Sequence, residues 1–481
     1  MHFSVTMRPD FISGNRQTRR IKMHFKTAAL AAAMFITIAY SARAEDHAPA
    51  PPAPTEAGET AQMPEPAPGS AITLRQALAL ALERSPALKA YSLEIRAREA
   101  RAIQEGLLPN PDVEAFVEDF GGTGSVEGFK GVETTILLSQ LIPLGGKITK
   151  KKKLAALNVG LADWDYEAVR LDVLTSTAKA FTNVLAAQRQ LKLTEELAAL
   201  AKRVHETVAE QAEAGEVSPI EEKRASVAYS QARISLDRAR REIEASRKVL
   251  ASMWGSTRPL FDNVEGNLNQ ILPIPTYEDI SEFILQNPDI ARWTTEIQQR
   301  EAALKLEKAR AIPDPIVSGG YRHLSEKDDN AFVIGLSIPI PVFDRNQGNI
   351  LEARRRISKA TDEQRNAVVT ANASLAAAYQ NLSSAYEEVK TLKNKVLPEA
   401  ESAYNSIFEG YREGKFFLLD LLDAQRTLFN ADIQYVQALQ IYHISLADVE
   451  RLTGTPIEEM QKSDSNVTIN QSGYKKTGET K

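Results

Sequence analysis

The sequence runs through one order of features twice, and this duplication limits the folds that the chain can adopt. Each copy begins with a short helical stretch that ends near a proline, Pro86 in the first copy and Pro288 in the second. A second helical segment follows and stops at a pair of prolines, because proline lacks a backbone donor and clashes with the preceding turn. The sequence therefore predicts two tandem repeats, residues 71–255 and 276–454, joined by an equatorial connector at residues 256–275.

Two strand-like segments follow the prolines in each copy. We expect these strands at residues 112–120, 131–142, 314–323 and 331–341. In "AFVIGLSIPI", Phe332, Ile334 and Leu336 fall on one face and small side chains on the other. A length of about ten residues suits a tilted membrane strand with its large side chains toward lipid. An isolated hairpin of a soluble protein has the same pattern, so the strands alone do not decide between the two.

Helix-compatible sequence after each strand pair is far longer than in most globular domains. It covers residues 145–254 and 344–454, and a glycine turn divides each stretch into a hairpin. About seventy residues at 1.5 Å each give a rod on the order of 100 Å. Apolar residues at three- and four-residue spacing, such as Leu193, Leu197 and Leu200, predict antiparallel coiled-coil packing within each hairpin.

Four strands cannot close a barrel, and open sheet edges in lipid cost several kcal/mol for each unsatisfied backbone group. Three chains would supply twelve strands, which is within the range of membrane barrels. The predicted fold is therefore mainly α-helical with a membrane β-barrel. It consists of two tandem repeats per chain and a trimer that forms a 12-stranded β-barrel on a long periplasmic α-helical barrel.

The N-terminal segment predicts export. Residues 1–44 form a signal peptide region, since "MHFKTAALAAAMFITIAYSARA" has a lysine, an apolar stretch and an A-x-A site; we expect the true start at Met23 and cleavage after Ala44. Residues 45–70 are a Pro/Ala-rich disordered tether, and residues 455–481 are a polar tail. Cysteine is absent, which excludes disulfides, thiolate metal sites and a lipidated N-terminal cysteine. A net charge of -5 gives no indication of a nucleic-acid partner.

The doubled layout, "GLLPNPDVEAFVEDFGG" and "LSQLIPLGGK" resemble the TolC family of outer-membrane efflux proteins, in particular its heavy-metal, CzcC-like and CusC-like branch. The resemblance implies a homotrimeric, passive exit duct in the outer membrane of a Gram-negative bacterium, with a long periplasmic extension. Its partners would be a periplasmic membrane-fusion adaptor and an inner-membrane pump of the resistance-nodulation-division (RND) class, and metal cations would be the cargo. No enzymatic activity and no cofactor are expected.

Two alternatives stay open at this point. The same scaffold serves multidrug and type I secretion channels, and only the two quoted segments favour metals. A soluble periplasmic coiled-coil adaptor or scaffold is an alternative of another class. The sequence does not name the exported cation, the cognate pump and adaptor, or the resting state of the pore.

Acidic residues near the second helical turn are the candidate pore gate. The segment "GKFFLLDLLDAQR" matches the family's tip motif at Gly414, Asp420 and Asp423, and the resemblance implies carboxylate rings at the pore entrance. Glu221 is the equivalent of Asp420 in the first copy, whereas Arg224 takes the position of Asp423. By spacing alone, solvated acids in the first turn of a helix are the simpler interpretation of these residues, and it is the family match that favours a gate.

The two glycine turns are the expected docking points for the adaptor, again by resemblance. The candidate residues are Gly215, Val217, Ser218, Gly414, Lys415, Phe416 and Leu418. Phe416 and its neighbour Phe417 either lie exposed at an interface or pack inside the coiled coil.

The strand-to-helix junctions repeat in both copies. Their candidate residues are Pro143, Gly145, Gly146, Pro341 and Asp344. The lysines of "KITKKKK" follow the first junction, where positive charge opposes the helix macrodipole; anionic lipid head groups would compensate, and a solvated face is the simpler alternative. His205, His323 and His443 have no histidine four residues away and no cysteine partner, so no metal site is expected.

Overall fold

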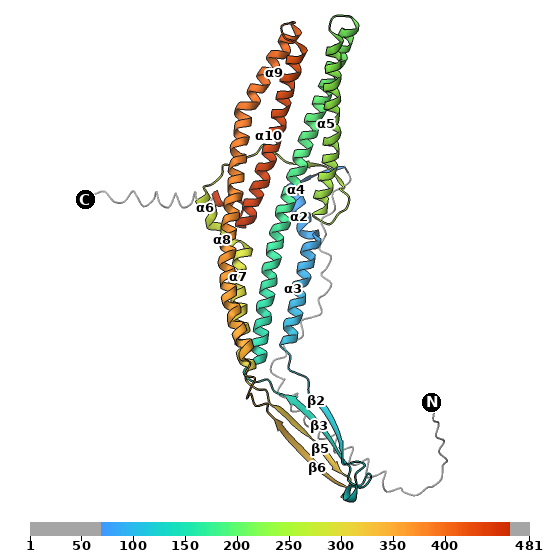
Figure 1. Cartoon of the computed structure of the whole chain (residues 1–481), viewed down its shortest axis with the longest axis vertical. Helices are drawn as coiled ribbons and strands as arrows, with labels where there is room; N and C mark the ends of the chain where they lie inside the picture. Colours follow the sequence, from blue (N-terminus) through green and yellow to red (C-terminus); the bar gives the residue numbers. More distant parts are fainter. Residues whose placement is uncertain (1–68, 462–481) are drawn as a thin grey trace, which may run out of the picture. The chain divides into compact units, whose positions relative to one another are not determined.

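A computed structural model describes residues 69–461 of the chain (Figure 1). The expected signal peptide, all but the last two residues of the tether and the tail from residue 462 lie outside the described residues. The described chain divides into two compact units. A strand-rich unit consists of residues 109–143 and 313–340, and a helical unit contains the remaining described residues. Within residues 69–461, no helix has an apolar stretch long enough to cross a bilayer.

The strand-rich unit is an antiparallel sheet with the strand order β2-β3-β5-β6. Its strands are β2 (Asp112–Glu118), β3 (Glu133–Leu141), β5 (Ile316–Leu324) and β6 (Asp329–Ser337). β3 pairs with β5, so both repeats contribute to one sheet, and β2 and β6 form its edges. The pairing needs a glycine at Gly320, because a Cβ atom there would lie 2.1 Å from the carbonyl oxygen of Ile136.

The two faces of this sheet differ in polarity, as the alternation in residues 331–341 predicts. Cross-strand register places large apolar side chains together on one face: Val113, Val117, Ile136, Leu138, Phe332, Ile334 and Leu336. Ile334 is 85% exposed in the single chain. On the other face Arg322 lies 3.0 Å from both Thr135 and Glu133. β6 ends at Ser337, before Pro339, so the apolar pattern continues beyond the strand.

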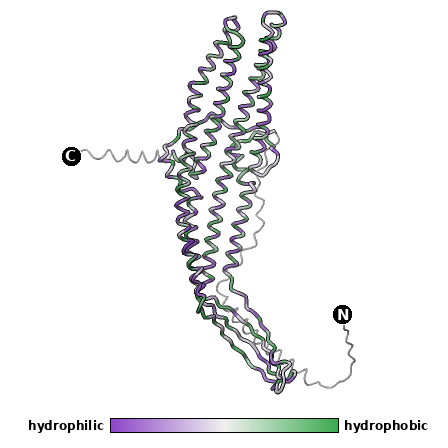
Figure 2. The backbone as a smooth tube through the Cα atoms, viewed as in Figure 1, coloured by the Kyte–Doolittle hydropathy of each residue, from purple (hydrophilic) through white to green (hydrophobic). Residues whose placement is uncertain are grey.

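The first repeat builds half of the helical unit. It contains α2 (Leu74–Arg84), α3 (Pro86–Glu105), α4 (Lys147–Glu213) and α5 (Pro219–Ser252). Figure 2 shows hydrophobic and hydrophilic residues alternating along these long helices, which is the pattern of an amphipathic helix. α4 and α5 pack through small residues, with Ala198 and Ala201 against Ala232. Leu193 of the expected apolar spacing is buried, and so is Val208 further along α4.

The second repeat builds the other half and differs in one respect. It contains α6 (Tyr277–Ser281), a 3-10 helix (Glu282–Gln286), α7 (Pro288–Arg310), α8 (Gln347–Thr391), α9 (Leu397–Arg412) and α10 (Leu418–Thr453). The rod expected at this position stays helical from Gln347 to Arg412 but contains a π-helical turn, Leu392–Val396, directly before α9. Pro398 in the first turn of α9 lacks an N–H group, so the regular hydrogen-bond ladder cannot pass through it. The corresponding helix α4 continues unbroken over 67 residues.

The connector between the repeats contains a strand that the sequence pattern did not predict. β4 (Phe261–Glu265) pairs in parallel with β1 (Ser70–Thr73), at the start of the first repeat. The side chain of Gln188 on α4 continues this ladder, because its amide accepts a hydrogen bond from the Val264 N–H (2.7 Å) and donates one to the Val264 carbonyl (3.2 Å). The connector is therefore fixed to α4 through backbone groups.

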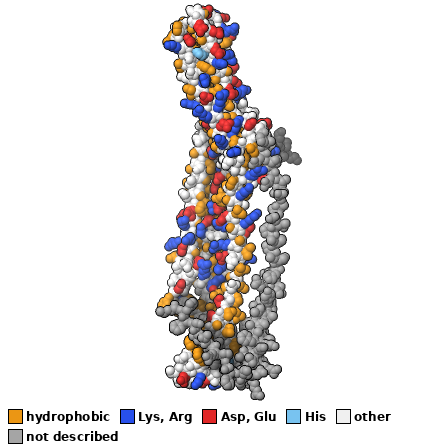
Figure 3. All heavy atoms as spheres, turned by 90° about the vertical axis from the view of Figure 1, so that its right-hand side faces the viewer, with side chains coloured by type: hydrophobic (Ala, Val, Ile, Leu, Met, Phe, Trp, Pro, Cys, Tyr) orange, Lys and Arg blue, Asp and Glu red, His pale blue; other side chains and the backbone are white. Residues whose placement is uncertain are grey.

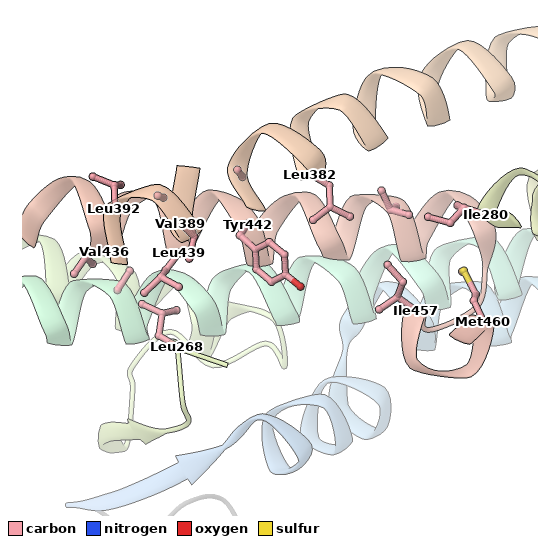
Figure 4. Packing of buried hydrophobic residues seen from close by; sticks show 14 of the residues in the cluster. Leu268, Ile280, Leu382, Val389, Leu392, Val436, Leu439, Tyr442, Ile457 and Met460 are labelled. Atoms are coloured by element: carbon pink, nitrogen blue, oxygen red, sulfur yellow. The ribbon is translucent and has the colours of Figure 1, made fainter. Parts of the chain in front are cut away.

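The main hydrophobic core lies where the connector meets α8 and α10 (Figure 4). Its labelled members are Leu268, Ile280, Leu382, Val389, Leu392, Val436, Leu439, Tyr442, Ile457 and Met460. Tyr442 is 1% exposed, and its hydroxyl accepts from the Leu272 N–H (2.9 Å) and donates to the Leu272 carbonyl (3.1 Å). His443 contacts the Leu268 carbonyl at 2.8 Å, and burial lowers the pKa of its imidazole. Two adjacent residues of α10 thus hold the connector in place.

Replacing Tyr442 by Phe tests this attachment. The substitution leaves both backbone groups of Leu272 without their partner, and we expect a local loss of about 1–3 kcal/mol. Hydrogen exchange followed by mass spectrometry should show faster exchange in the peptide covering residues 266–276. Tyr91→Phe, at an exposed position of α3, should leave that peptide unchanged. Equal exchange in the two variants would contradict the role of Tyr442.

Candidate functional site

Each helical hairpin ends in a tight turn of the same design. Gly215 lies in the turn between α4 and α5 with φ +76°, and Gly414 lies between α9 and α10 with φ +75°. A Cβ atom at either position would meet nothing within 4 Å, so the left-handed backbone and not crowding favours glycine there. Ser218 caps α5 by accepting from the Ile220 N–H at 3.3 Å. The turns therefore reverse the chain with local interactions alone.

Asp420 caps the start of α10. Its carboxylate accepts a hydrogen bond from the Phe417 N–H at 3.0 Å, which satisfies a backbone donor that the helix itself leaves unpaired. Glu221, its equivalent in the first repeat, lies instead near Tyr411 of α9. Burial raises the pKa of the Tyr411 hydroxyl, and the Glu221 carboxylate raises it further. The two candidate gate acids thus have different surroundings.

Asp423 is paired with a base. Its carboxylate lies 2.7 Å from Arg426 on the next turn of α10, and the two side chains are 61% and 73% exposed. A pair this exposed contributes about 0–1 kcal/mol to stability, so it restrains the acid weakly. Asp423 also lines a cavity of about 570 Å³ between α4, α5 and α10, together with Arg224, the residue at the same position of the first repeat. The structure therefore brings the two equivalent positions to one cavity.

Charged and apolar side chains both line this cavity, which we call the tip groove. Basic side chains of Lys223, Arg224 and Arg426 surround the single carboxylate of Asp423. Apolar side chains cover the rest: Leu197, Ile220, Val227, Leu419, Leu422 and Phe429. The sequence did not reveal this groove, because it forms between the first hairpin, α4 and α5, and helix α10, which is distant along the chain. The Asp423–Arg426 pair could have been anticipated from its three-residue spacing on a helix.

The other tip residues divide into exposed and buried ones. Phe417 is 76% exposed, whereas the Phe416 ring is 44% exposed and lies over Gly410, where a Cβ atom would be 2.4 Å away. Leu418 is 1% exposed and packs with Val208 and Ala225 of the other hairpin. Val217 packs against the same cluster, and Lys415 pairs with Glu413 at 2.5 Å. Leu418 and Val217 consequently hold the two tips together from inside.

Both strand-to-helix junctions use left-handed backbone. Gly145 and Gly146 have φ +66° and +67°, and a Cβ atom on Gly145 would lie 2.7 Å from the Ile312 side chain. In the second copy, Asn346 takes this role with φ +59°, and its N–H donates to Asp344 at 2.8 Å. Pro143 and Pro341 lie in the connecting segments, outside helix and strand. The residues singled out at the first junction thus make the turn, and the sequence missed Asn346 at the second.

No metal centre emerges from the described residues. In residues 69–461, no three side chains of His, Asp or Glu are arranged to hold a metal ion.

One further acid on α10, Asp432, was not singled out from the sequence. Burial raises the pKa of its carboxyl group, and the nearby Arg189 guanidinium opposes this shift.

Two tandem helical hairpins, joined through one sheet that both repeats build, define the TolC-like class of outer-membrane channel folds. A family model described as "Outer membrane efflux protein" matches residues 77–256 and 280–455, which is one match in each repeat. The chain belongs to the outer membrane efflux protein family. The TolC-like fold predicted from the sequence is confirmed, and with it the outer membrane as the location. Proteins of this class work together with efflux-pump partners.

Individual relatives agree with this assignment. The chain is 34% identical to the cobalt-zinc-cadmium resistance protein CzcC of Cupriavidus metallidurans over 384 residues, which are 80% of this chain and 90% of that protein. It is 24% identical to the nickel-cobalt-cadmium resistance protein NccC of Alcaligenes xylosoxydans xylosoxydans, over 61% of this chain and 65% of that protein. The crystal structure of the CmeC outer membrane channel of Campylobacter jejuni has a TM-score of 0.67 at 20% identity, covering 82% and 89% of the two chains.

Removing the Asp420 cap should loosen the second tip. Asp420→Ala takes away the acceptor for the Phe417 N–H, and the loss of such a cap costs about 1 kcal/mol. We expect faster hydrogen exchange at the start of α10, measured on a peptide that covers residues 416–424. The matched control is Asp423→Ala, which removes an exposed carboxylate one turn later and leaves the cap in place. Equal exchange in both variants would show that the Asp420 carboxylate does not support the turn.

Proposed function

We propose that this chain forms the outer-membrane exit duct of an efflux system that exports heavy-metal cations. The main support for this proposal is the 34% identity to CzcC, a cobalt-zinc-cadmium resistance protein, over 90% of that protein's length. The similarity to NccC, a nickel-cobalt-cadmium resistance protein, supports the same cargo class. A multidrug or type I secretion duct remains the alternative within this fold, and the growth experiment below separates the two.

A homotrimer is the assembly that would cover the two unpaired sheet edges and the exposed apolar side chains of the single chain. β2 and β6 are sheet edges, and in a bilayer their free backbone groups need partners. Three sheets joined edge to edge would form a barrel of twelve strands. On the face drawn in Figure 3, hydrophobic side chains run in stripes between charged ones along the helical unit. Exposed large apolar residues on the long helices support contacts between chains: Leu93, Ile103, Val227, Val249, Leu351 and Val369.

The hairpin tips are the proposed contact with a periplasmic membrane-fusion adaptor, and through it with an inner-membrane pump of the RND class. Phe417 supports this because it is a largely exposed aromatic ring next to the turn glycine Gly414. Gly215, Ser218, Lys415 and the exposed edge of Phe416 would complete the surface. Leu418 and Val217 would act indirectly, by keeping the two tips in contact.

Asp420, Asp423 and Glu221 are the proposed gate residues. In a trimer each carboxylate would occur three times around the pore axis and attract cations. The basic residues of the tip groove reduce this negative charge, since Arg426 forms an ion pair with Asp423 and Arg224 lines the same groove. We therefore propose a gate of mixed charge, in which carboxylates and guanidinium groups exchange partners as the tips move.

Growth of a deletion strain tests the function directly. Cells that lack this gene, with and without a restored copy, are grown on graded zinc, cobalt, cadmium, nickel, copper and silver salts and on a panel of dyes and detergents. We expect increased sensitivity to some of the cations and none to the dyes. The pattern of sensitivity would name the cargo. Sensitivity to dyes and detergents alone would replace the metal proposal with a multidrug duct.

Conductance in planar bilayers tests the gate. We expect Asp420→Asn combined with Asp423→Asn to leave the trimer intact and to lower the preference for cations or change the resting conductance. Asparagine keeps an acceptor for the cap, so the turn should persist. The control is Asp362→Asn, which changes an exposed acid of α8 in a pair with Arg365 at the same three-residue spacing. Identical selectivity and conductance in both variants would return Asp420 and Asp423 to a structural role.

A further inference from the structure

One end of the helical unit gathers four helix ends into a single surface, which we call the crossing end. Here α3 and α7 finish and α4 and α8 begin, next to the points where the chain passes to the strand-rich unit. Lys147 donates to the Ile312 carbonyl at 2.5 Å, and Asn346 donates to the Glu307 carbonyl at 2.7 Å. Lys151 lies 3.8 Å from a glutamate of α3. These contacts tie the start of both long rods to the same place.

Positive charge concentrates at this end. Residues 144–162 contain five lysines and no acidic residue, although the whole chain has a net charge of -5. Neither α4 nor α8 has an acid in its first turn or a side-chain cap, whereas α5 and α10 begin with acids. Basic residues at a helix start oppose the macrodipole, so a nearby anion would stabilise them.

The local ion pairs do not supply that anion. Lys147 and Lys150 are already engaged, since they donate to the carbonyls of Ile312 and Gly145. Arg356 is bound to Glu352 within α8. At this end of the helical unit, the exposed basic side chains that form no ion pair with an acid in the described part of the chain include Lys152, Lys153, Arg354 and Arg355.

The crossing end also exposes large apolar side chains. Their exposed fractions reach 90% for Phe343 and 68% for Leu108. Further exposed apolar side chains at this end of the helical unit include Leu107, Leu144, Ile312 and Val342. Apolar side chains beside unpaired basic ones are the combination by which proteins bind an anionic membrane interface. Solvated charge alone would explain the lysines and arginines but not the exposed apolar residues among them.

We propose that the crossing end binds anionic phospholipid head groups of the inner leaflet of the outer membrane. The inference rests on the outer-membrane location and on the sheet as the membrane-spanning part. Lys147 follows Leu141, the last residue of β3, by six positions, and six residues span at most about 20 Å. The first turns of α4 therefore stay close to the membrane surface. Arg354 and Arg355 lie in the first turns of α8 at the same end of the helical unit, and each guanidinium group can bind phosphate oxygens with two hydrogen bonds.

Lipid titration of the purified full-length trimer in dodecyl maltoside tests the proposal. The probes are phosphatidylglycerol, zwitterionic phosphatidylethanolamine and lipid A, with bound lipid counted by native mass spectrometry and trimer melting measured in parallel. We expect tighter binding of phosphatidylglycerol than of phosphatidylethanolamine, and weaker binding as salt is raised. Combining Lys152→Gln, Lys153→Gln, Arg354→Gln and Arg355→Gln should lower the affinity for phosphatidylglycerol by roughly tenfold.

The matched control neutralises four exposed basic residues elsewhere on the helical unit, through Arg75→Gln, Arg238→Gln, Arg241→Gln and Lys248→Gln. It should bind phosphatidylglycerol as the unchanged protein does. If the first variant does not assemble, the lysine pair and the arginine pair are neutralised separately, and each should lose roughly threefold.

Three outcomes would overturn the proposal: equal losses in the two variants, no preference for phosphatidylglycerol, or a preference for lipid A, which belongs to the opposite leaflet. Metal resistance is measured separately in the deletion strain. If the deletion strain shows no change in metal resistance while phosphatidylglycerol still binds at the crossing end, only the metal proposal has failed. If metal resistance changes but phosphatidylglycerol does not bind there, only the lipid proposal has failed.

Discussion

Backbone hydrogen bonding in the four-stranded sheet is the constraint on which the rest of the structure depends. The β3–β5 ladder joins the hairpin of one repeat to the hairpin of the other, so the four-stranded sheet needs both repeats. β2 and β6 stay unpaired at the edges, a condition that a bilayer does not tolerate. Duplication and the proposed trimer both provide partners for unpaired strand edges. The duplication pairs two hairpins within one chain, and the trimer would pair the remaining edges β2 and β6 between chains.

The two repeats share a plan but differ in helix geometry and in the placement of their acids. α4 runs without a break, while its counterpart contains the π-helical turn Leu392–Val396 before Pro398. The acids also differ, since Asp420 caps its own helix and Glu221 lies against the opposite hairpin at Tyr411. Single π-helical turns inside α-helices are frequent at functional sites. The second hairpin contains this turn, and it is also the hairpin that carries both Asp420 and Asp423.

Local patterns explain which features the sequence could predict. The alternation in residues 331–341 is written into consecutive residues, and the register of β6 follows it, with Phe332, Ile334 and Leu336 on one face. β1 pairs with β4, which is far away in the sequence. Because β1 has only four residues, its hydrophobic alternation is too short to predict a strand from the sequence. The burial of Leu418 likewise depends on helices of the other hairpin. Sequence reasoning thus assigned the acids and glycines to the hairpin tips but could not assign their spatial neighbours.

Electrostatics limits what such a duct can distinguish. The polar face of the sheet carries Asp112, Glu114, Glu118, Glu133 and Asp329 against the single base Arg322. In the proposed trimer this face would line the lumen, and its negative field would favour cations over anions. A field of this kind acts on charge and not on ligand preference, whereas choosing between zinc, cobalt and cadmium requires a site of defined ligands and geometry. Specificity for one metal is therefore expected in the pump and adaptor, while this chain would set the sign of the charge that leaves the cell.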